Sequence, residues 1–353
     1  MRPDQWNAIE KLLAGEYAGI HAALIVDSPW IPPFLGISTE AYINDLNVYL
    51  QANMEIMNRF PEIIFFPGFW LETGMAAEPS AFGAQVEYYS HQPPVVRHVL
   101  EDVSEVSKLI QPNPKKDGLM PGILKQYGTI LPIVRDRGFD IKIVAARGPM
   151  TLASHLMGVT NFLIGLKTDP ENTHKLMRIM TRTVKEWLEA QAEVLPDVEG
   201  ILVLDDIMGF LSEQDYLEFA HGYFKDIFSL PARLKALHND TPNNISFSYL
   251  EKLGVNMFNF SHLVPISTPR KQVGDNIILM GNISPLDTMV YGSYDDVYDA
   301  ASQCIRQNNG HPRFLLSAGG GVSMGTPEST IRAIIDAVKG EASQARAQAQ
   351  SAK

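Results

Sequence analysis

The chain has 353 residues, of which 45% are hydrophobic, and it carries a net charge of −11. A chain of this length buries a large core, and an acidic balance without basic clusters excludes nucleic acid and anionic membrane surfaces as partners. The single cysteine, Cys304, excludes an intrachain disulfide framework and an all-cysteine metal site.

The first element expected is an amphipathic helix over residues 1–15, MRPDQWNAIEKLLAG. This segment lacks the apolar core of a secretory leader. The longest apolar run, IIFFPGFWL (63–71), is far shorter than the roughly 20 residues that span a bilayer. The sequence therefore predicts a cytoplasmic protein without a membrane segment.

Short, mostly apolar runs recur along the chain and alternate with helical stretches. Strands buried on both faces and separated by helices are typical of a parallel sheet, and eight such units favour a (β/α)₈ barrel. No glycine-rich phosphate-binding sequence follows the first run, which argues against a doubly wound sheet. The predicted strands are 21–27, 62–69, 140–148, 200–206, 235–240, 254–262, 276–284 and 313–321.

Helices are expected over 168–195, 212–234 and 326–341, the last with Thr326 or Ser329 as its N-cap. No Ser/Gly linker divides the chain, so residues 1–341 are predicted to form a single barrel with an N-terminal helical extension. The Ala/Gln-rich segment 342–353 is predicted to be a flexible tail.

Polar and aromatic side chains gather where the predicted strands end. In a (β/α)₈ barrel the active site lies at these carboxyl ends, so the same residues are candidates for catalysis and binding. So many charged and amide groups would not be buried unpaired in a core. The candidates are Asp27, Trp30, Phe69, Trp70, Arg147, Asp205, Asp206, Met208, His238, Asp240, Asn259, His262, Asn282 and Ser317.

Several longer motifs resemble the uroporphyrinogen decarboxylase superfamily. They are RGPMTLASHLMGVTNFLIGLKTDPENTHKLM (147–177), LDDIMGFLSEQDYLEFAHGYFKDIF (204–228), LHNDTPN (237–243), LMGNISPLDTMVYGSYDDV (279–297) and AGGGVSMGTPESTIRAIIDAV (318–338). The resemblance covers roughly residues 1–340. It implies a distorted (β/α)₈ barrel from one of two branches, the porphyrinogen decarboxylases or the methyltransferases that exchange methyl groups with a corrinoid protein.

The decarboxylase branch is similar in fold but differs at the segment after the first strand. Members of that branch place an arginine-rich loop there, which neutralises the many carboxylates of the substrate. Here the segment reads VDSPWIPPFLGIS (26–38) and contains no Arg or Lys. A loop rich in aromatic residues and proline suits a small apolar ligand instead.

The methyltransferase branch implies a histidine at the position of His238. In the members that methylate thiols, a His-x-Cys pair and a later cysteine bind zinc. In this chain Asp240 replaces the first cysteine, and the later position falls in LSAGGG, which contains no sulfur. A zinc site with harder ligands, formed by His238, Asp240 and another carboxylate, is the alternative. The other carboxylate could come from Asp206 or from Glu72, Glu78 or Glu87.

Because both zinc-binding cysteine positions lack a cysteine here, the sequence favours the half-reaction that does not methylate a thiol. There, a methyl group passes from a donor, often an aryl methyl ether, to the Co(I) corrinoid of a separate corrinoid protein. His238, Asp206 and Asp240 are then expected to act on the ether oxygen as a general acid or through a metal ion. The remaining candidates would bind the small-molecule donor. A homodimer is compatible with the resemblance.

Alternatives remain open for the function and for individual residues. The chain could instead be a lyase acting on a small carboxylated substrate, with Arg147 as the carboxylate anchor. Asp205 or Asp206 could cap the next helix, and His238 could be a core histidine. The segment from Asp240 to Pro242 could be a plain turn, and Arg147 could form a structural ion pair. The aromatic residues within 64–70 could lie in the core, except Trp70, which lies beyond the predicted strand.

Overall fold

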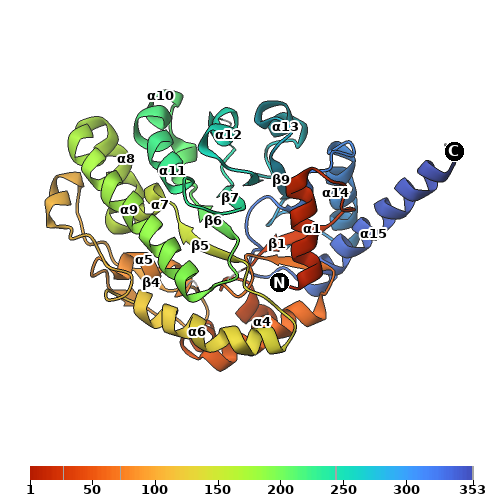
Figure 1. Cartoon of the computed structure of the whole chain (residues 1–353), viewed down its shortest axis with the longest axis horizontal. Coiled ribbons are helices and arrows are strands. Elements are labelled where there is room, and N and C mark those ends of the chain that lie inside the picture. The colour runs from red at the N-terminus through yellow and green to blue at the C-terminus, as the bar shows by residue number, and fades with distance from the viewer. Residues whose placement is uncertain (27, 72, 243–244, 352–353) are drawn as a thin grey trace.

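The computed structural model describes residues 1–26, 28–71, 73–242 and 245–351. Asp27 and Glu72, two of the candidates from the sequence, lie outside the described residues. Eight parallel strands form one curved sheet with helices around its outer side (Figure 1). The strands are β1 (Ala22–Ile25), β2 (Ile63–Phe66), β5 (Ile143–Arg147), β6 (Gly200–Leu204), β7 (Leu234–Asn239), β8 (Met257–Phe260), β9 (Ile278–Ile283) and β10 (Phe314–Ala318).

The order of strands in the sheet is that of a (β/α)₈ barrel. Neighbouring strands follow the order β2-β1-β10-β9-β8-β7-β6-β5, so β1 pairs with both β2 and β10. Among the described residues no ladder joins β2 to β5. The chain between these two strands instead contains a short antiparallel pair, β3 (Val86–Glu87) and β4 (Val95–Val96). The predicted fold and all eight predicted strands are confirmed, and the distortion lies between β2 and β5.

The longer helices are α1 (Pro3–Ala14), α4 (Leu46–Arg59), α6 (Met120–Asp136), α7 (Pro149–Met157), α8 (Val159–Thr168), α9 (Pro170–Val194), α14 (Tyr294–Gln307) and α15 (Glu328–Ser351). The shorter ones are α2 (Ile31–Leu35), α3 (Thr39–Asn44), α5 (Ala77–Ser80), α10 (Glu213–Tyr216), α11 (Gly222–Ile227), α12 (Leu250–Leu253) and α13 (Ser267–Val273). Within the described part of the chain, no helix is long and apolar enough to cross a membrane.

The predicted helices are confirmed in place but differ in extent. The helix expected over 168–195 is α9, and Asp169 caps it by accepting a hydrogen bond from the Asn172 backbone N–H. The helix expected over 212–234 runs without interruption through α10, a π-helical turn (Leu217–His221) and α11, but it ends at Ile227. The backbone of α15 continues through the predicted tail as far as Ser351.

The alternation of side chains along the strands divides the core into two parts. One cluster lies between the sheet and the outer helices, and a second fills the inside of the barrel. The α1 residues Trp6, Ile9 and Leu12 belong to the inner cluster. Helix α1 therefore closes one end of the barrel, and the other end, where the strands terminate, is left for a site.

Candidate active site

Four polar side chains continue the inward-facing rows of the barrel at its carboxyl end. In β7, Leu234 and Ala236 belong to the inner cluster, and His238 is the next residue of the same parity. The same alternation places Arg147 in β5, Asn259 in β8 and Ser317 in β10 in the inward-facing rows. These residues form the uppermost layer of the barrel interior.

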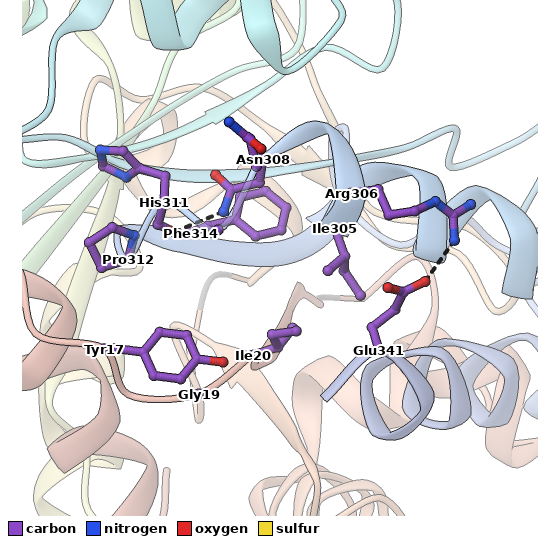
Figure 2. A pocket seen from close by; sticks show the side chains of 12 residues that line it. Tyr17, Gly19, Ile20, Ile305, Arg306, Asn308, His311, Pro312, Phe314 and Glu341 are labelled. Atoms are coloured by element: carbon purple, nitrogen blue, oxygen red, sulfur yellow. Dashed lines mark hydrogen bonds and ion pairs between the residues drawn. The ribbon is translucent and has the colours of Figure 1, made fainter. Parts of the chain in front are cut away.

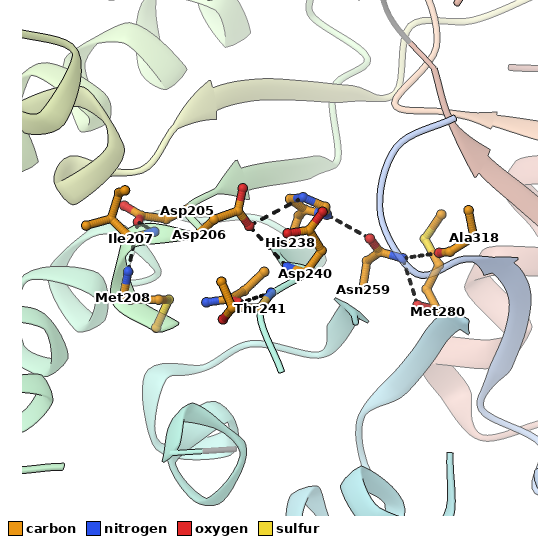
Figure 3. Close-up of polar contacts among 11 residues, drawn as sticks. Asp205, Asp206, Ile207, Met208, His238, Asp240, Thr241, Asn259, Met280 and Ala318 are labelled. Atoms are coloured by element: carbon orange, nitrogen blue, oxygen red, sulfur yellow. Dashed lines mark hydrogen bonds and ion pairs between the residues drawn. The ribbon is translucent and has the colours of Figure 1, made fainter. Parts of the chain in front are cut away.

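His238 is held in one orientation by Asn259 (Figure 3). The Nδ1 atom of His238 lies 2.7 Å from Oδ1 of Asn259. The Nδ2 atom of Asn259 donates to the carbonyl oxygens of Met280, at 2.8 Å, and Ala318, at 3.0 Å. Because carbonyl oxygens only accept, Oδ1 of Asn259 must face the ring, and Nδ1 of His238 must donate to it. In the neutral imidazole, Nε2 therefore carries the free lone pair.

This lone pair faces two carboxylates. The Nε2 atom of His238 lies 3.6 Å from Oδ1 of Asp206, which also accepts a 3.0 Å hydrogen bond from the backbone N–H of Asp240. One donor atom from each of His238, Asp206 and Asp240 lies within 4.8 Å of the other two. Burial raises the pKa of the Asp240 carboxyl above its ordinary value, and the nearby Asp206 carboxylate adds to this increase. We refer to these three residues as the His–Asp cluster.

The His–Asp cluster fits a hard divalent cation. Ligand atoms at tetrahedral zinc are about 3.4 Å apart, since each lies about 2.1 Å from the metal. The 3.6 Å between His238 and Asp206 is close to that value, and the other separations within the cluster are no more than 4.8 Å. A bound cation would also relieve the repulsion between the two carboxylates. No thiolate contributes, because the only cysteine, Cys304, is buried with its Sγ atom directed at Oδ1 of Asn282, 3.7 Å away. Imidazole with carboxylates is a donor set for zinc and similar borderline or hard ions.

Glycine residues allow the loops after β6, β7 and β10 to pack closely around the cluster. A Cβ atom on Gly209 would overlap the Thr241 hydroxyl, which itself donates to Oδ1 of Asn239. Gly320 has a φ of 139°, and a Cβ atom there would lie 2.9 Å from Oδ2 of Asp240. A Cβ atom on Gly319 would overlap the backbone of His262. The glycine run after β10 therefore packs closely against Asp240 and His262.

Asp205, although adjacent to Asp206 in sequence, faces the opposite side of the sheet. It is completely buried, and its carboxylate accepts hydrogen bonds from the backbone N–H groups of Met150, Thr151, Ile207 and Met208. Burial raises the pKa of Asp205 to about 7 in spite of these donors. Gly148 has no side chain because a Cβ atom there would overlap this carboxylate. The helix-cap alternative describes Asp205, whereas Asp206 lies beside His238.

Replacing Asp205 with alanine is expected to lower the free energy of unfolding by about 3 kcal/mol or more, since four buried N–H groups lose their acceptor. Urea denaturation followed by circular dichroism measures this loss. Asp206→Ala serves as the matched control and is expected to cost about 1 kcal/mol or less. An equal loss of stability in both variants would contradict the division of roles between the two aspartates.

Three residues predicted to line the donor pocket lie in the core instead. The Nε1 atom of Trp30 donates to the carbonyl oxygen of Thr326, and the indole packs on Phe34 with ring centroids 4.7 Å apart. Phe69 packs edge-on against Phe139, and Met208 belongs to the outer core cluster. All three are at most 2% exposed, so in this structure they are packed in the core. Their apolar character is used for packing between the sheet and the helices.

The remaining candidates have mixed surroundings. Trp70 is partly exposed and lies against the Arg147 guanidinium, whose carbon is 4.9 Å from the ring centroid. Asn282 donates to the carbonyl oxygens of Ser261 and Val264 and so holds the loop after β8. His262 lies close enough to lower the pKa of Asp240.

The two described glutamates considered as additional metal ligands are engaged elsewhere. Glu78 is buried and accepts a hydrogen bond from the backbone N–H of Arg147. Glu87 forms an ion pair with Arg97 on the β3–β4 hairpin.

The orienting role of Asn259 was missed from the sequence, where it was a candidate for binding the donor. The alternation of side chains along β8 could have indicated this role. Asn259 faces the same side of the sheet as Met257, and it pairs with His238 of the neighbouring strand.

A separate cavity of about 330 Å³ lies at the opposite end of the barrel, next to the starts of β1 and β10 (Figure 2). Tyr17, Ile305 and Phe314 contribute its apolar lining, and an ion pair between Arg306 and Glu341 borders it. None of the candidate residues lines it.

Comparison with known proteins decides the family. The family described as Uroporphyrinogen decarboxylase (URO-D) matches residues 36–341. The chain belongs to this family.

Named relatives come from both branches. A methylated-thiol–coenzyme M methyltransferase from Methanosarcina mazei is 28% identical over 244 residues, which cover 68% of this chain and 62% of that protein, less than two-thirds of its length. A uroporphyrinogen decarboxylase from Anaeromyxobacter sp. is 25% identical over 252 residues, which cover 69% of this chain and 70% of that protein. A solved structure of a methyltransferase from Methanosarcina mazei superposes with a TM-score of 0.76 at 17% identity, over 94% of this chain and 97% of that one. The structural likeness agrees with the barrel fold.

Proposed function

We propose that this protein transfers a methyl group from a small methoxylated aromatic donor to the Co(I) corrinoid of a separate corrinoid protein. The observation that carries the proposal is the oriented lone pair on Nε2 of His238, which faces Asp206 and Asp240 where the strands end. The similarity to a methyltransferase relative supports methyl transfer as the reaction.

The donor set of the His–Asp cluster favours an oxygen leaving group. A thiol acceptor calls for a soft, thiolate-rich site, whereas imidazole and carboxylates suit an ether oxygen. A porphyrinogen is disfavoured because residues 26–38, after the first strand, contain no Arg or Lys to neutralise its carboxylates. Decarboxylase relatives nevertheless make release of carbon dioxide from a small carboxylated substrate the alternative outcome to test.

The proposed reaction breaks the methyl–oxygen bond of the ether and forms a methyl–cobalt bond on the partner protein. The ether oxygen leaves as a phenolate, and the cluster stabilises this developing negative charge. A zinc ion held by His238, Asp206 and Asp240 would supply Lewis acidity at this oxygen. Asn259 keeps Nε2 of His238 directed at Asp206, and the Asp206 contact to the Asp240 backbone fixes the two loops that carry the carboxylates.

The test is to mix the protein with Co(I) cobalamin and 2-methoxyphenol and to follow methylcobalamin by its visible spectrum. We expect methylcobalamin and the demethylated phenol to form together. Release of carbon dioxide from a carboxylated aromatic without any methylcobalamin would contradict the proposal and favour the lyase alternative.

The exposed apolar residues on the loops after the strands support a protein partner. These loops surround the site at the carboxyl end of the barrel. The residues are Phe210 after β6, Leu263 after β8, Leu286 and Tyr291 after β9, and Met324 after β10, with exposures of 61%, 64%, 47%, 75% and 43%. Apolar side chains grouped around an active site are typical of a protein–protein interface, and we propose that the corrinoid protein docks here.

Replacing both Phe210 and Tyr291 with serine is expected to raise the KM for the corrinoid protein about tenfold or more, because large aromatic side chains dominate interface energies. The rate with free cobalamin should stay within about twofold, since neither residue belongs to the His–Asp cluster. Tyr17→Ser is the control, because Tyr17 is 65% exposed at the opposite end of the barrel. An equal effect on free cobalamin would show that the two aromatics serve the chemistry rather than docking.

A further inference from the structure

The cavity at the end of the barrel opposite the His–Asp cluster has the size of a small-molecule site. Its volume is about 330 Å³, and ligand pockets in proteins range from about 300 to 1,000 Å³. It lies between the segment that leads into β1 and the turn that joins α14 to β10 (Figure 2). The active site of a (β/α)₈ barrel lies at the other end, so a ligand in this cavity is distinct from the methyl donor.

The cavity has apolar side chains on two opposite sides. In Figure 2, Tyr17 and Ile20 lie on one side, and Ile305, Pro312 and Phe314 lie on the other. A flat aromatic ring between these two sides would bury apolar surface on both of its faces. The shape and the lining of the cavity therefore favour a planar ligand.

The charged groups at the border of the cavity are already paired. Arg306 and Glu341 form an ion pair at 2.7 Å, and the Glu341 side chain is only 11% exposed. Both ring nitrogens of His311 are engaged, because Nδ1 accepts the backbone N–H of Arg313 at 3.2 Å and Nε2 lies 3.3 Å from Oδ1 of Asp275. Burial lowers the pKa of His311 below its ordinary value, so the ring is neutral at neutral pH. This lining favours a neutral ligand, since a charged one would have to break the ion pair.

A hydrogen-bond acceptor of the lining is left without a partner. Asn308 is 8% exposed, and its Nδ2 atom donates to the carbonyl oxygen of His311 at 2.8 Å. The other amide atom, Oδ1, can only accept, and it makes no hydrogen bond with any described residue. A buried acceptor in this state costs about 1–3 kcal/mol. A ligand that donates one hydrogen bond to Asn308 would remove this cost.

We propose that the cavity binds a neutral, planar, bicyclic ring that carries one ring N–H group, as indoles do. The apolar side chains cover the two faces of the ring, and Oδ1 of Asn308 accepts its N–H. An indole N–H only donates, which matches an amide oxygen that only accepts. A bicyclic ring fills more of the 330 Å³ than a single ring and so buries more apolar surface. The proposal does not depend on the reaction at the His–Asp cluster, because none of its residues lines the cavity.

Titration of the full chain with indole tests the proposal by nuclear magnetic resonance. With ¹³C-labelled isoleucine methyl groups, indole should shift the resonances of Ile20 and Ile305, which Ile20→Val and Ile305→Val assign. The resonance of Ile201, in β6, should not move. Indole should bind about tenfold more tightly than benzothiophene, which has the same shape but no N–H group.

Two variants separate the hydrogen bond from the cavity itself. Asn308→Leu removes the acceptor and should reduce the preference for indole to about twofold or less. Ile305→Trp fills the cavity and should abolish the binding of both ligands. Asn161→Leu is the matched control, because Asn161 donates to the carbonyl oxygen of Glu101 on the surface of α8, and it should bind indole normally. Circular dichroism confirms that each variant is folded.

Three results would overturn the inference. They are equal affinities for indole and benzothiophene in the unaltered protein, shifts confined to isoleucines other than Ile20 and Ile305, and normal indole binding by Ile305→Trp. The first two are measured without any variant that alters Asn308, so they decide the matter even if Asn308→Leu does not fold.

Discussion

Replacing His238 with alanine is expected to lower the rate of methyl transfer by about 10²-fold or more, the usual effect of removing a group that acts on the leaving atom. The ring is only 6% exposed, and its Nε2 atom lies 3.6 Å from Oδ1 of Asp206. Single-turnover rates with Co(I) cobalamin measure the loss. Calorimetric affinity for the donor should change much less.

His221→Ala is the control for this variant, because His221 lies on the π-helical turn between α10 and α11. It should retain normal transfer rates. If His238→Ala turns over at a near-normal rate with the best donor, the residue is a buried histidine beside a turn, and the proposed catalytic role fails.

Removing both carboxylates of the His–Asp cluster is expected to abolish tight zinc binding. In the double variant Asp206→Asn and Asp240→Asn, affinity should fall by about 100-fold or more, because only one anionic or imidazole ligand remains. Asn259→Leu should weaken zinc binding by about 10- to 100-fold, since residues that orient a histidine ligand typically contribute this much. Competition with a chromophoric chelator measures each affinity, independently of any methyl transfer.

Asp275→Asn offers a matched control, because Asp275 pairs with His311 at 3.3 Å at the opposite end of the barrel. Its zinc stoichiometry should equal that of the unaltered protein. A protein that contains no metal and stays active after chelation would contradict the metal role. The raised pKa of Asp240 would then make its carboxyl the acid that protonates the leaving oxygen.

The barrel could be predicted from the sequence because each strand is a continuous apolar run, which is what burial on both faces of a parallel sheet requires. The alternation of apolar runs with helical stretches also identified the strand ends, and His238, Asp206 and Asp240 converge there as expected. The π-helical turn at Leu217–His221 could not be predicted, because the helical periodicity on either side of it is uninterrupted.

The roles of individual residues were harder to predict because strand position alone does not say which way a side chain points. Asp205 and Asp206 follow the same strand, yet one caps α7 and the other faces His238. The side chains of β6 that point into the barrel are those of Leu202 and Leu204, so the alternation places Asp206 on the inner side and Asp205 on the outer side. Trp30 and Phe69 are similar, since an aromatic residue near a strand end packs equally well in the core or in a pocket.

The fate of the methyl carbon tests the central proposal most directly. A single turnover of the protein with Co(I) cobalamin and 2-methoxyphenol labelled with ¹³C in its methyl group should place the label on cobalt. The labelled methylcobalamin and the demethylated phenol should appear in equal amounts and at the same rate, and both should be lost in His238→Ala. Label that remains in the donor, or that appears as methanol or carbon dioxide while cobalamin stays unmethylated, would contradict the account.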